Sequence, residues 1–291
     1  MDKAYFNQLE QNFIKAKKKN YKCMFCNKTN AINSHFAPKV NWLSQITQNS
    51  KLYHVERRHF CEESSSFFCF AEKGLNNMLC QYIFCSFHDY KLFENIDNGN
   101  PNYDSYQVRI RVFYRNICAV LRQSEINIEG LNMCTKSPIA LPALNKENDI
   151  QKLLTPYKSI LEQEINSNVN DGQFLFKLFT FERVDICASN IIYYEDNVPI
   201  SINIFPYKKN TAVLIGYKNY IESDYISKFI DLWGKTEDFK KNLTYFMVIS
   251  PENWAISKQL YDSITPQKRN DYLHYLQNPT QPYNENFNLF E

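Results

Sequence analysis

Cysteine and histidine residues gather in one part of this chain. Residues 20–100 hold six of the nine cysteines and four of the five histidines found among the 291 residues. The apolar residues of this segment follow no clear helical period. A segment without a large apolar core needs another source of stability. It is therefore expected to form a small domain organised by its cysteines and histidines.

The strongest local motif is Cys23-Met-Phe-Cys26. A C-x-x-C pair is either one half of a zinc site or a redox motif. The redox motif requires a strand and a helix of the thioredoxin type, and none is evident here. The flanking Tyr21-Lys22 and Asn27-Lys28 indicate instead a knuckle between two short strands, whose tight turn delivers two thiolates to a metal ion.

A second pair of the same spacing is Cys85-Ser-Phe-His88, which precedes a helix predicted over His88–Phe93. Cys23, Cys26, Cys85 and His88 together are predicted to form a closed site of three cysteines and one histidine for a structural Zn²⁺ ion. The other cysteines of the segment are alternative donors, which we interpret as buried thiols. These are Cys61, Cys69 and Cys80.

The charge of the chain is unevenly distributed. The formal net charge is only +2, but residues 1–60 contain eleven lysines and arginines and three acidic residues, a net charge of +8. The remainder carries a net charge of −6. A basic segment on an acidic body favours a polyanionic partner such as nucleic acid. The alternative is a solvated helix face, which a run of charges also produces.

The rest of the chain indicates an α+β fold. A turn at Asn98–Asn102 divides a first domain, residues 1–100, from a second domain, residues 103–291. Helices are predicted near residues 2–19, 105–121, 148–166 and 222–233, and from Ser250-Pro251 and Thr265-Pro266. Strands of a mostly antiparallel sheet are predicted at 174–181, 184–194, 199–205, 211–217 and 243–249.

Composition and missing motifs narrow the function further. The chain has only six glycines and neither a G-x-G-x-x-G nor a G-x-x-x-x-G-K-[ST] sequence, which argues against Rossmann and P-loop enzymes. It shows no apolar leader and no run of about eighteen apolar residues. We therefore expect a cytoplasmic protein without membrane contact, whose cysteines lie in a reducing compartment.

Nine residues after Cys26 comes the run Ser34-His35-Phe36-Ala37-Pro38-Lys39. The order C-x-x-C, H-x-x-P-K and a distant C-x-x-H at a helix start resembles the HNH endonucleases over about a third of the chain. The resemblance implies a ββα-metal site on a treble-clef zinc scaffold, and metal-dependent hydrolysis of phosphodiester bonds. It makes His35 the general base that activates a water molecule. The alternative for His35 is a structural hydrogen bond or a further zinc ligand.

The chain departs from the family at several positions. Ser34 stands where many members have a metal-binding aspartate, and His88 is followed by Asp89 rather than by histidine or asparagine. Asp89 is a hard oxygen donor suited to a catalytic Mg²⁺ or Mn²⁺ ion. Its alternative role is that of an acidic residue favoured by the helix dipole. The family's middle asparagine has no secure match in this chain, and Asn76 and Asn77 are candidates for it.

The long insertion between the two zinc half-sites contains further basic residues besides the lysine of the H-x-x-P-K motif. Lys39, Arg57 and Arg58 are predicted to bind the phosphates of nucleic acid, with DNA favoured over RNA as the substrate. A surface basic patch is the alternative. No residues suggest a reader of base sequence, so the expected binding is directed to the backbone.

These observations lead to three functional hypotheses. The first is an HNH-like nuclease, by analogy a bacterial or antiviral defence effector, whose second domain binds a protein partner or forms a homodimer. The second is a zinc-stabilised nucleic-acid-binding or adaptor protein without catalysis. The third places an enzyme site in the C-terminal sheet, where Glu182 and Asp185 are isolated carboxylates without a recognisable catalytic arrangement.

Overall fold

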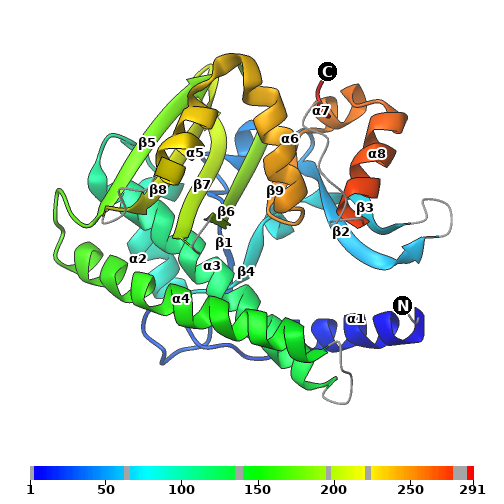
Figure 1. Cartoon of the computed structure of the whole chain (residues 1–291). Helices are drawn as coiled ribbons and strands as arrows, with labels where there is room; N and C mark the ends of the chain where they lie inside the picture. The colour runs from blue at the N-terminus through cyan, green and yellow to red at the C-terminus, as the bar shows by residue number, and fades with distance from the viewer. Residues whose placement is uncertain (1–2, 62–65, 135–139, 195–197, 220–223, 278–286) are drawn as a thin grey trace. The chain divides into compact units, whose positions relative to one another are not determined.

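The computed structural model describes residues 3–61, 66–134, 140–194, 198–219, 224–277 and 287–291 (Figure 1). By its internal contacts the chain forms two compact units. The first unit comprises Met1–Phe36 and Cys80–Gly172, and the second comprises Ala37–Leu79 and Gln173–Glu291. Each unit therefore consists of two stretches of sequence.

The first unit is mostly helical with one very small sheet. Its strands β1 and β4 pair antiparallel over three residues each, with His35 opposite Cys80. The described elements of this unit are α1 (Lys3–Lys17), β1 (Asn33–His35), β4 (Cys80–Tyr82), α2 (Ser86–Asp97), α3 (Tyr106–Asn132) and α4 (Ala140–Asn166). A two-stranded sheet of this length has little stability of its own, so neighbouring elements must hold it.

Helices α3 and α4 are the longest elements, and both extend beyond the predicted ranges. The apolar period of α3 fades after Leu121 because polar side chains occupy buried positions there. Arg122 forms an ion pair with Glu125, and the hydroxyl of buried Ser124 donates to the carbonyl of Glu147 in α4 at 3.0 Å. Helix α4 runs on through Pro156.

The second unit contains a seven-stranded sheet in the order β3-β2-β9-β6-β7-β8-β5, and every described pairing in it is antiparallel. The mostly antiparallel sheet and its four predicted strands from Phe174 onward are thus confirmed. The strands are β2 (Lys51–Cys61), β3 (Ser66–Gly74), β5 (Phe174–Phe181), β6 (Ile186–Tyr194), β7 (Val198–Tyr207), β8 (Asn210–Lys218) and β9 (Trp254–Ile256).

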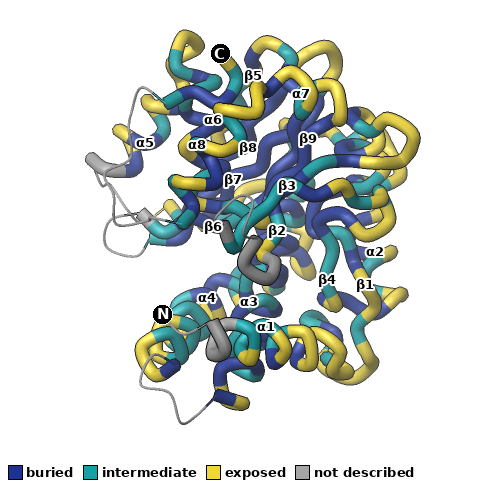
Figure 2. Tube along the Cα trace, turned by 90° about the vertical axis from the view of Figure 1, so that its right-hand side faces the viewer, coloured by how far each residue is buried: buried dark blue, intermediate teal, exposed yellow. Residues whose placement is uncertain are grey.

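The core of the second unit lies between this sheet and its helices. Alternate residues of β7, namely Ile200, Ile202 and Ile204, point into one apolar cluster with Trp233 and Phe246 from the helices. Figure 2 shows β7 and β8 as almost wholly buried. The helices of this unit are α5 (Asp224–Gly234), α6 (Phe239–Ile249), α7 (Lys258–Ser263) and α8 (Pro266–Gln277).

Two predictions near the C-terminus were wrong. The expected strand at 243–249 is part of α6, where Leu243, Phe246 and Met247 are buried at helical spacing against the sheet. The helix expected from Ser250-Pro251 is replaced by the short strand β9, which pairs with β6 and β2. Three buried apolar residues show no alternation, so a strand this short has no period to detect.

The helix start at Thr265-Pro266 is confirmed. Helix α8 begins at Pro266, and the Thr265 hydroxyl accepts from the backbone N–H of Lys268 at 3.3 Å. This is the expected N-terminal arrangement, because the first residue of a helix makes no helical hydrogen bond through its N–H, the group that proline lacks. Ser257 caps α7 in the same way, accepting from the N–H of Leu260 at 3.0 Å.

The division into units differs from the boundary expected near residue 100. The chain passes between the units after Phe36, Leu79 and Gly172. In the second unit, Tyr53 of β2 pairs with Ile256 of β9, and the Trp42 ring stacks on that of Phe205 with centroids 4.2 Å apart. Pairings between segments so distant in sequence leave no local signal, whereas a turn such as Asn98–Asn102 does.

A close approach of α1 and α3 gives the first prediction. Alanine normally favours a helix over glycine by about 1 kcal/mol. A Cβ atom on Gly130 of α3, however, would lie 2.7 Å from Cε1 of Phe13, whose ring packs on the cluster containing Leu131, Cys134 and Ala140. Gly130→Ala is therefore expected to destabilise the protein by about 1–3 kcal/mol in chemical denaturation, because the site is already filled.

The control is the same substitution in a Phe13→Ala background. Removing the ring removes the clash, so Gly130→Ala should then stabilise the protein by the helix-propensity difference of about 1 kcal/mol. A stabilising effect of Gly130→Ala in the wild-type background would contradict the described contact between α1 and α3.

Candidate metal centre

Three cysteines and one histidine of the first unit meet at one point. The ligand atoms of Cys23, Cys26, Cys85 and His88 all lie within 4.8 Å of one another. The described distances include 3.1 Å between Cys85 Sγ and His88 Nδ1, and 3.7 Å between Cys23 Sγ and His88 Nδ1. Zinc bonds of about 2.3 Å to sulfur and 2.0 Å to nitrogen place tetrahedral ligand atoms at comparable separations. These four residues, the Cys/His cluster, thus form a group that could hold a metal ion.

The first half of the Cys/His cluster is formed by a tight turn. The backbone N–H of Asn27 donates to the carbonyl of Cys23 at 2.9 Å, and the N–H of Cys23 donates to the carbonyl of Thr29 at 2.8 Å. Asn27 has a φ of 54°, a left-handed conformation that asparagine tolerates better than most residues. Lys22 and Asn30 pair across the turn, as expected for a knuckle between short extended segments.

The second half lies at the start of α2. Cys85 is the extended residue that precedes the helix, and its carbonyl accepts from the N–H of Asp89 at 2.9 Å. The i to i+3 spacing of Cys85 and His88 turns both side chains to the same side of this first turn. A hydrogen bond of 2.9 Å from the N–H of Met24 to the carbonyl of Ile83 joins the knuckle to the segment before α2.

The two thiols of the knuckle lie in different electrostatic environments. Burial raises the pKa of Cys23, because a thiolate loses solvation inside the protein. The Cys26 pKa is lowered to about 5, chiefly by the hydroxyl of Thr29, whose Oγ1 lies 3.5 Å from the sulfur, and by the N–H groups of Thr29 and Lys28. A thiolate is the form that binds a metal ion, so Cys26 is prepared for that role.

The donor set is compatible with zinc. Soft thiolates and an imidazole in a closed group of four are typical of structural zinc sites. Hard ions such as Mg²⁺ and Ca²⁺ prefer oxygen ligands. Aromatic rings border His88, since the Phe25 and Phe87 ring centroids lie 4.7 Å and 5.0 Å from its own. They restrict the orientation of the imidazole.

The two predicted catalytic residues lie on separate elements of the same unit. His35 is the last residue of β1 and is half-buried, and Asp89 lies in the first turn of α2. Burial raises the pKa of Asp89, while the charge of Arg115 and a hydrogen bond with Ser34 partly offset this rise. Asp89 Oδ1 is buried without a hydrogen-bond partner among the described residues. The structure therefore brings Asp89 to Ser34, the residue before His35.

Arg115 is a residue that the sequence analysis missed. Its side chain is only 2% exposed, and its guanidinium forms two hydrogen bonds of 2.8 and 2.6 Å with the carboxylate of Asp97 at the end of α2. The guanidinium carbon also lies 3.8 Å from the centre of the Phe93 ring. Arg115 thus fixes α2 against α3. Its position within the apolar run of α3 was a detectable signal, because buried arginines are rare unless paired.

The alternative zinc donors lie apart from the Cys/His cluster where they are described. Cys80 is in β4, and its sulfur accepts from the Asn33 side-chain amide at 3.0 Å. Cys69 is in β3, in the second unit. The side chain of Cys61 lies outside the described ones.

The predicted phosphate-binding residues belong to the second unit. Lys39 is half-buried just after Pro38, and Arg57 is exposed on β2 with its guanidinium 5.4 Å from the centre of the Phe68 ring. The side chain of Arg58 lies outside the described ones. Asn76 and Asn77 form part of a short 3-10 helix in the same unit. Their roles in binding or cutting nucleic acid stay predictions.

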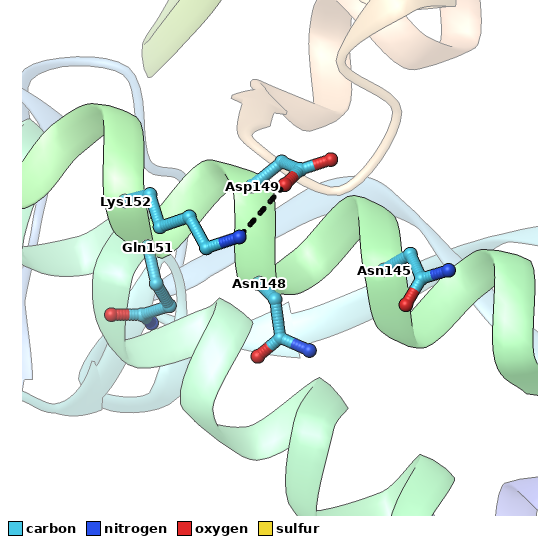
Figure 3. Close-up of a pocket in the computed structure, with 5 residues that line it drawn as sticks. All are labelled: Asn145, Asn148, Asp149, Gln151 and Lys152. Atoms are coloured by element: carbon cyan, nitrogen blue, oxygen red, sulfur yellow. Dashed lines mark ion pairs between the residues drawn. The ribbon is translucent and has the colours of Figure 1, made fainter.

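A shallow hollow on α4 offers no comparable chemistry. Figure 3 shows its lining side chains, all from one helix and mostly amides, with a single ion pair of 3.5 Å between Lys152 and Asp149. Both charged residues are exposed, and no nucleophile or metal-binding pair lies among the lining residues. The residues are Asn145, Asn148, Asp149, Gln151 and Lys152.

Comparison with family models, curated proteins and solved structures finds no match to this chain. Among the described helices, none combines the length and apolar character needed to cross a membrane. The HNH resemblance therefore rests on the motif residues themselves.

Zinc content tests the Cys/His cluster. Purified protein is expected to contain one zinc ion per chain by elemental analysis, and Cys26→Ser should reduce this to well below one, because serine is a much poorer zinc ligand. Cys26 is preferable to the buried Cys23 as the tested position, since its partial exposure keeps packing changes small. Unfolding should also shift to lower temperature, because metal binding contributes to folding.

Cys69→Ser is the matched control, because Cys69 is equally half-buried but lies outside the Cys/His cluster. It should leave the zinc content unchanged. Zinc-free wild-type protein, or a Cys26→Ser variant that retains a full complement of zinc, would contradict the metal centre.

Proposed function

We propose that this chain is a metal-dependent nuclease of the HNH type that hydrolyses phosphodiester bonds of nucleic acid. The observation that supports the proposal is the order of parts around the Cys/His cluster. Within the first unit, the knuckle is followed by β1, by β4, which pairs antiparallel with β1, and by α2. Residues 37–79, which belong to the second unit, are inserted between the two strands. His35 ends β1, and Asp89 lies in the first turn of α2. This order is the one that the HNH resemblance implies.

His35 is proposed to act as the general base. Imidazole titrates near neutral pH, so it accepts a proton from water more readily than other neutral side chains. The water oxygen then forms a bond to the phosphorus atom as the bond to the leaving oxygen breaks. The half-buried position of His35 at the end of a strand leaves part of the side chain open to solvent.

Asp89 is proposed to hold a divalent Mg²⁺ or Mn²⁺ ion, which stabilises negative charge on the phosphate and leaving oxygen when it is bound. Within the described part of the chain Asp89 Oδ1 is buried and has no hydrogen-bond partner, which is costly for a carboxylate unless a ligand or water satisfies it. The hydroxyl of Ser34 interacts with the same carboxylate from β1. The Cys/His cluster, made of sulfur and nitrogen donors, is proposed to hold a separate, structural Zn²⁺ ion.

Local positive charge supports nucleic acid as the substrate. No aspartate or glutamate occurs between Glu10 and Glu56. The lysines that precede and follow the knuckle in the first unit are exposed, as phosphate contacts require. They are Lys15, Lys17, Lys18, Lys19, Lys22 and Lys28, of which Lys19 also forms an ion pair with Glu129.

The broader role that we propose is that of a bacterial or antiviral defence effector. The second unit would then recognise a trigger or a protein partner, or form a homodimer. This part of the proposal rests on analogy with other nucleases joined to unrelated domains.

A second candidate function is a zinc-stabilised nucleic-acid-binding protein without catalysis. Ser34 stands where many HNH nucleases have an aspartate, and a hydroxyl is a weaker metal ligand than a carboxylate. Burial also raises the pKa of Asp89, which disfavours its charged form. Both observations weaken the divalent site without affecting the Cys/His cluster.

Cleavage by a His35→Ala variant separates the two functions. Wild-type protein is expected to cut plasmid DNA or single-stranded RNA in the presence of Mg²⁺ or Mn²⁺. His35→Ala should reduce the rate by about 10²–10⁴, the usual contribution of a general base, while retaining the zinc content of the wild type. His274→Ala is the control, because His274 is an exposed histidine on α8 of the second unit.

Equal cleavage by wild type and His35→Ala would contradict the role of His35. Binding of nucleic acid by the wild type without any cleavage would favour the second candidate function.

A further inference from the structure

Two large aromatic side chains are exposed beside the Cys/His cluster. Phe87, which precedes His88 in α2, and Tyr90, which follows it, are each 59% exposed. The opposite side of α2 is buried through Leu92, Phe93 and Ile96. The i to i+3 spacing places both rings on one outward surface of the helix. This surface, formed by Phe87 and Tyr90, is the aromatic face of α2.

Each ring of this face contacts a neighbouring side chain of α2. The Phe87 ring stands at 80° to the His88 ring, with centroids 5.0 Å apart. The Tyr90 hydroxyl donates to the carboxylate of Glu94 one turn later. Because His88 belongs to the Cys/His cluster and Arg115 pairs with Asp97 at the end of α2, the helix that carries both rings is anchored at each end. Such preorganisation lowers the entropic cost of binding.

A positive charge lies against the Phe87 ring, and the Glu94 carboxylate lies at the Tyr90 hydroxyl. The ammonium group of Lys91 lies 5.4 Å from the centre of the Phe87 ring. Exposed Lys22 and Lys28 belong to the knuckle that is joined to α2 through the Cys/His cluster. An aromatic face with a lysine against one ring is complementary to an unpaired base and its phosphate, since bases stack on aromatic rings whatever their sequence. Bases paired inside a duplex present no free face for such stacking.

We propose that the aromatic face of α2 binds single-stranded nucleic acid by stacking unpaired bases on Phe87 and Tyr90. The inference rests on the proposed function and names the substrate class of the proposed nuclease. Stacking on this face would bring an unpaired strand to the metal centre. A second copy of this chain is a poorer occupant. Stable protein interfaces bury about 800 Å² on each partner, whereas this face consists of two rings flanked by the charged side chains of Lys91 and Glu94.

A tryptophan reporter tests stacking directly. The three native tryptophans, Trp42, Trp233 and Trp254, are at most 2% exposed, so their emission is shielded from added bases. The Phe87→Trp variant places one indole on the aromatic face. Its fluorescence is expected to be quenched by oligo(dT) or oligo(U), in buffer with zinc retained but no Mg²⁺ or Mn²⁺, so that binding occurs without cleavage. A duplex of the same length should quench it far less.

Alanine variants measure the contribution of each ring. Phe87→Ala and Tyr90→Ala should each weaken binding of the single strand at least about fivefold, the lower end of what one stacked base contributes. Tyr82→Ala is the matched control, because Tyr82 is 43% exposed on β4 of the same unit but lies outside the aromatic face. Unchanged zinc content and melting temperature would show that each variant is folded.

Several results would overturn the inference. The first is that both alanine variants bind single strands as tightly as the wild type does. The second is that duplex quenches the Phe87→Trp variant as strongly as a single strand, or that the wild type binds no single strand at all. The third is that removing the rings changes the oligomeric state in sedimentation. If cleavage depends on His35 while the rings have no effect, the inference fails and the proposed nuclease stands. If the rings are required for binding but nothing is cut, the inference holds and the nuclease is replaced by the non-catalytic binding function.

Discussion

The meeting of Cys23, Cys26, Cys85 and His88 is the contact on which the first unit depends. Cys23 and His88 are 65 positions apart in the chain, yet their ligand atoms lie 3.7 Å from each other. Strands β1 and β4 contribute three residues each, too few to form a stable sheet alone. A metal ion held there would join the knuckle to α2, close a long loop and offset its entropic cost. The Cys/His cluster joins the knuckle to the first turn of α2, where Asp89 also lies.

The first turns of α2 concentrate what the chain offers to a ligand. Four consecutive positions carry an exposed aromatic ring, a cluster histidine, a half-buried carboxylate and a second exposed ring. They are Phe87, His88, Asp89 and Tyr90. Arg115 holds this helix from the side of α3 through Asp97 and Phe93. A rigid support of this kind is what a binding or catalytic site needs, because small displacements of reacting groups are costly. A ligand of the proposed zinc ion, the proposed stacking rings and the proposed catalytic carboxylate therefore share one short segment.

The sequence was informative where a motif or a period was local. The two pairs of the Cys/His cluster have the spacing of zinc half-sites, and the strands from Phe174 onward are rich in β-branched and aromatic residues. It was uninformative where distant segments pair. Residues 37–79 lie between the two half-sites but belong to the second unit, because β2 pairs with β9. Helix α6 was mistaken for a strand because its apolar residues form an almost continuous run, in which helical and strand periods look alike.

The central claim is that a zinc ion is coordinated by three sulfurs and one nitrogen at the Cys/His cluster. X-ray absorption at the zinc edge of the purified full-length chain tests it most directly. The account predicts a first shell of three sulfur atoms at about 2.3 Å and one nitrogen atom at about 2.0 Å. A first shell made only of oxygen and nitrogen, or the absence of bound zinc, would contradict it.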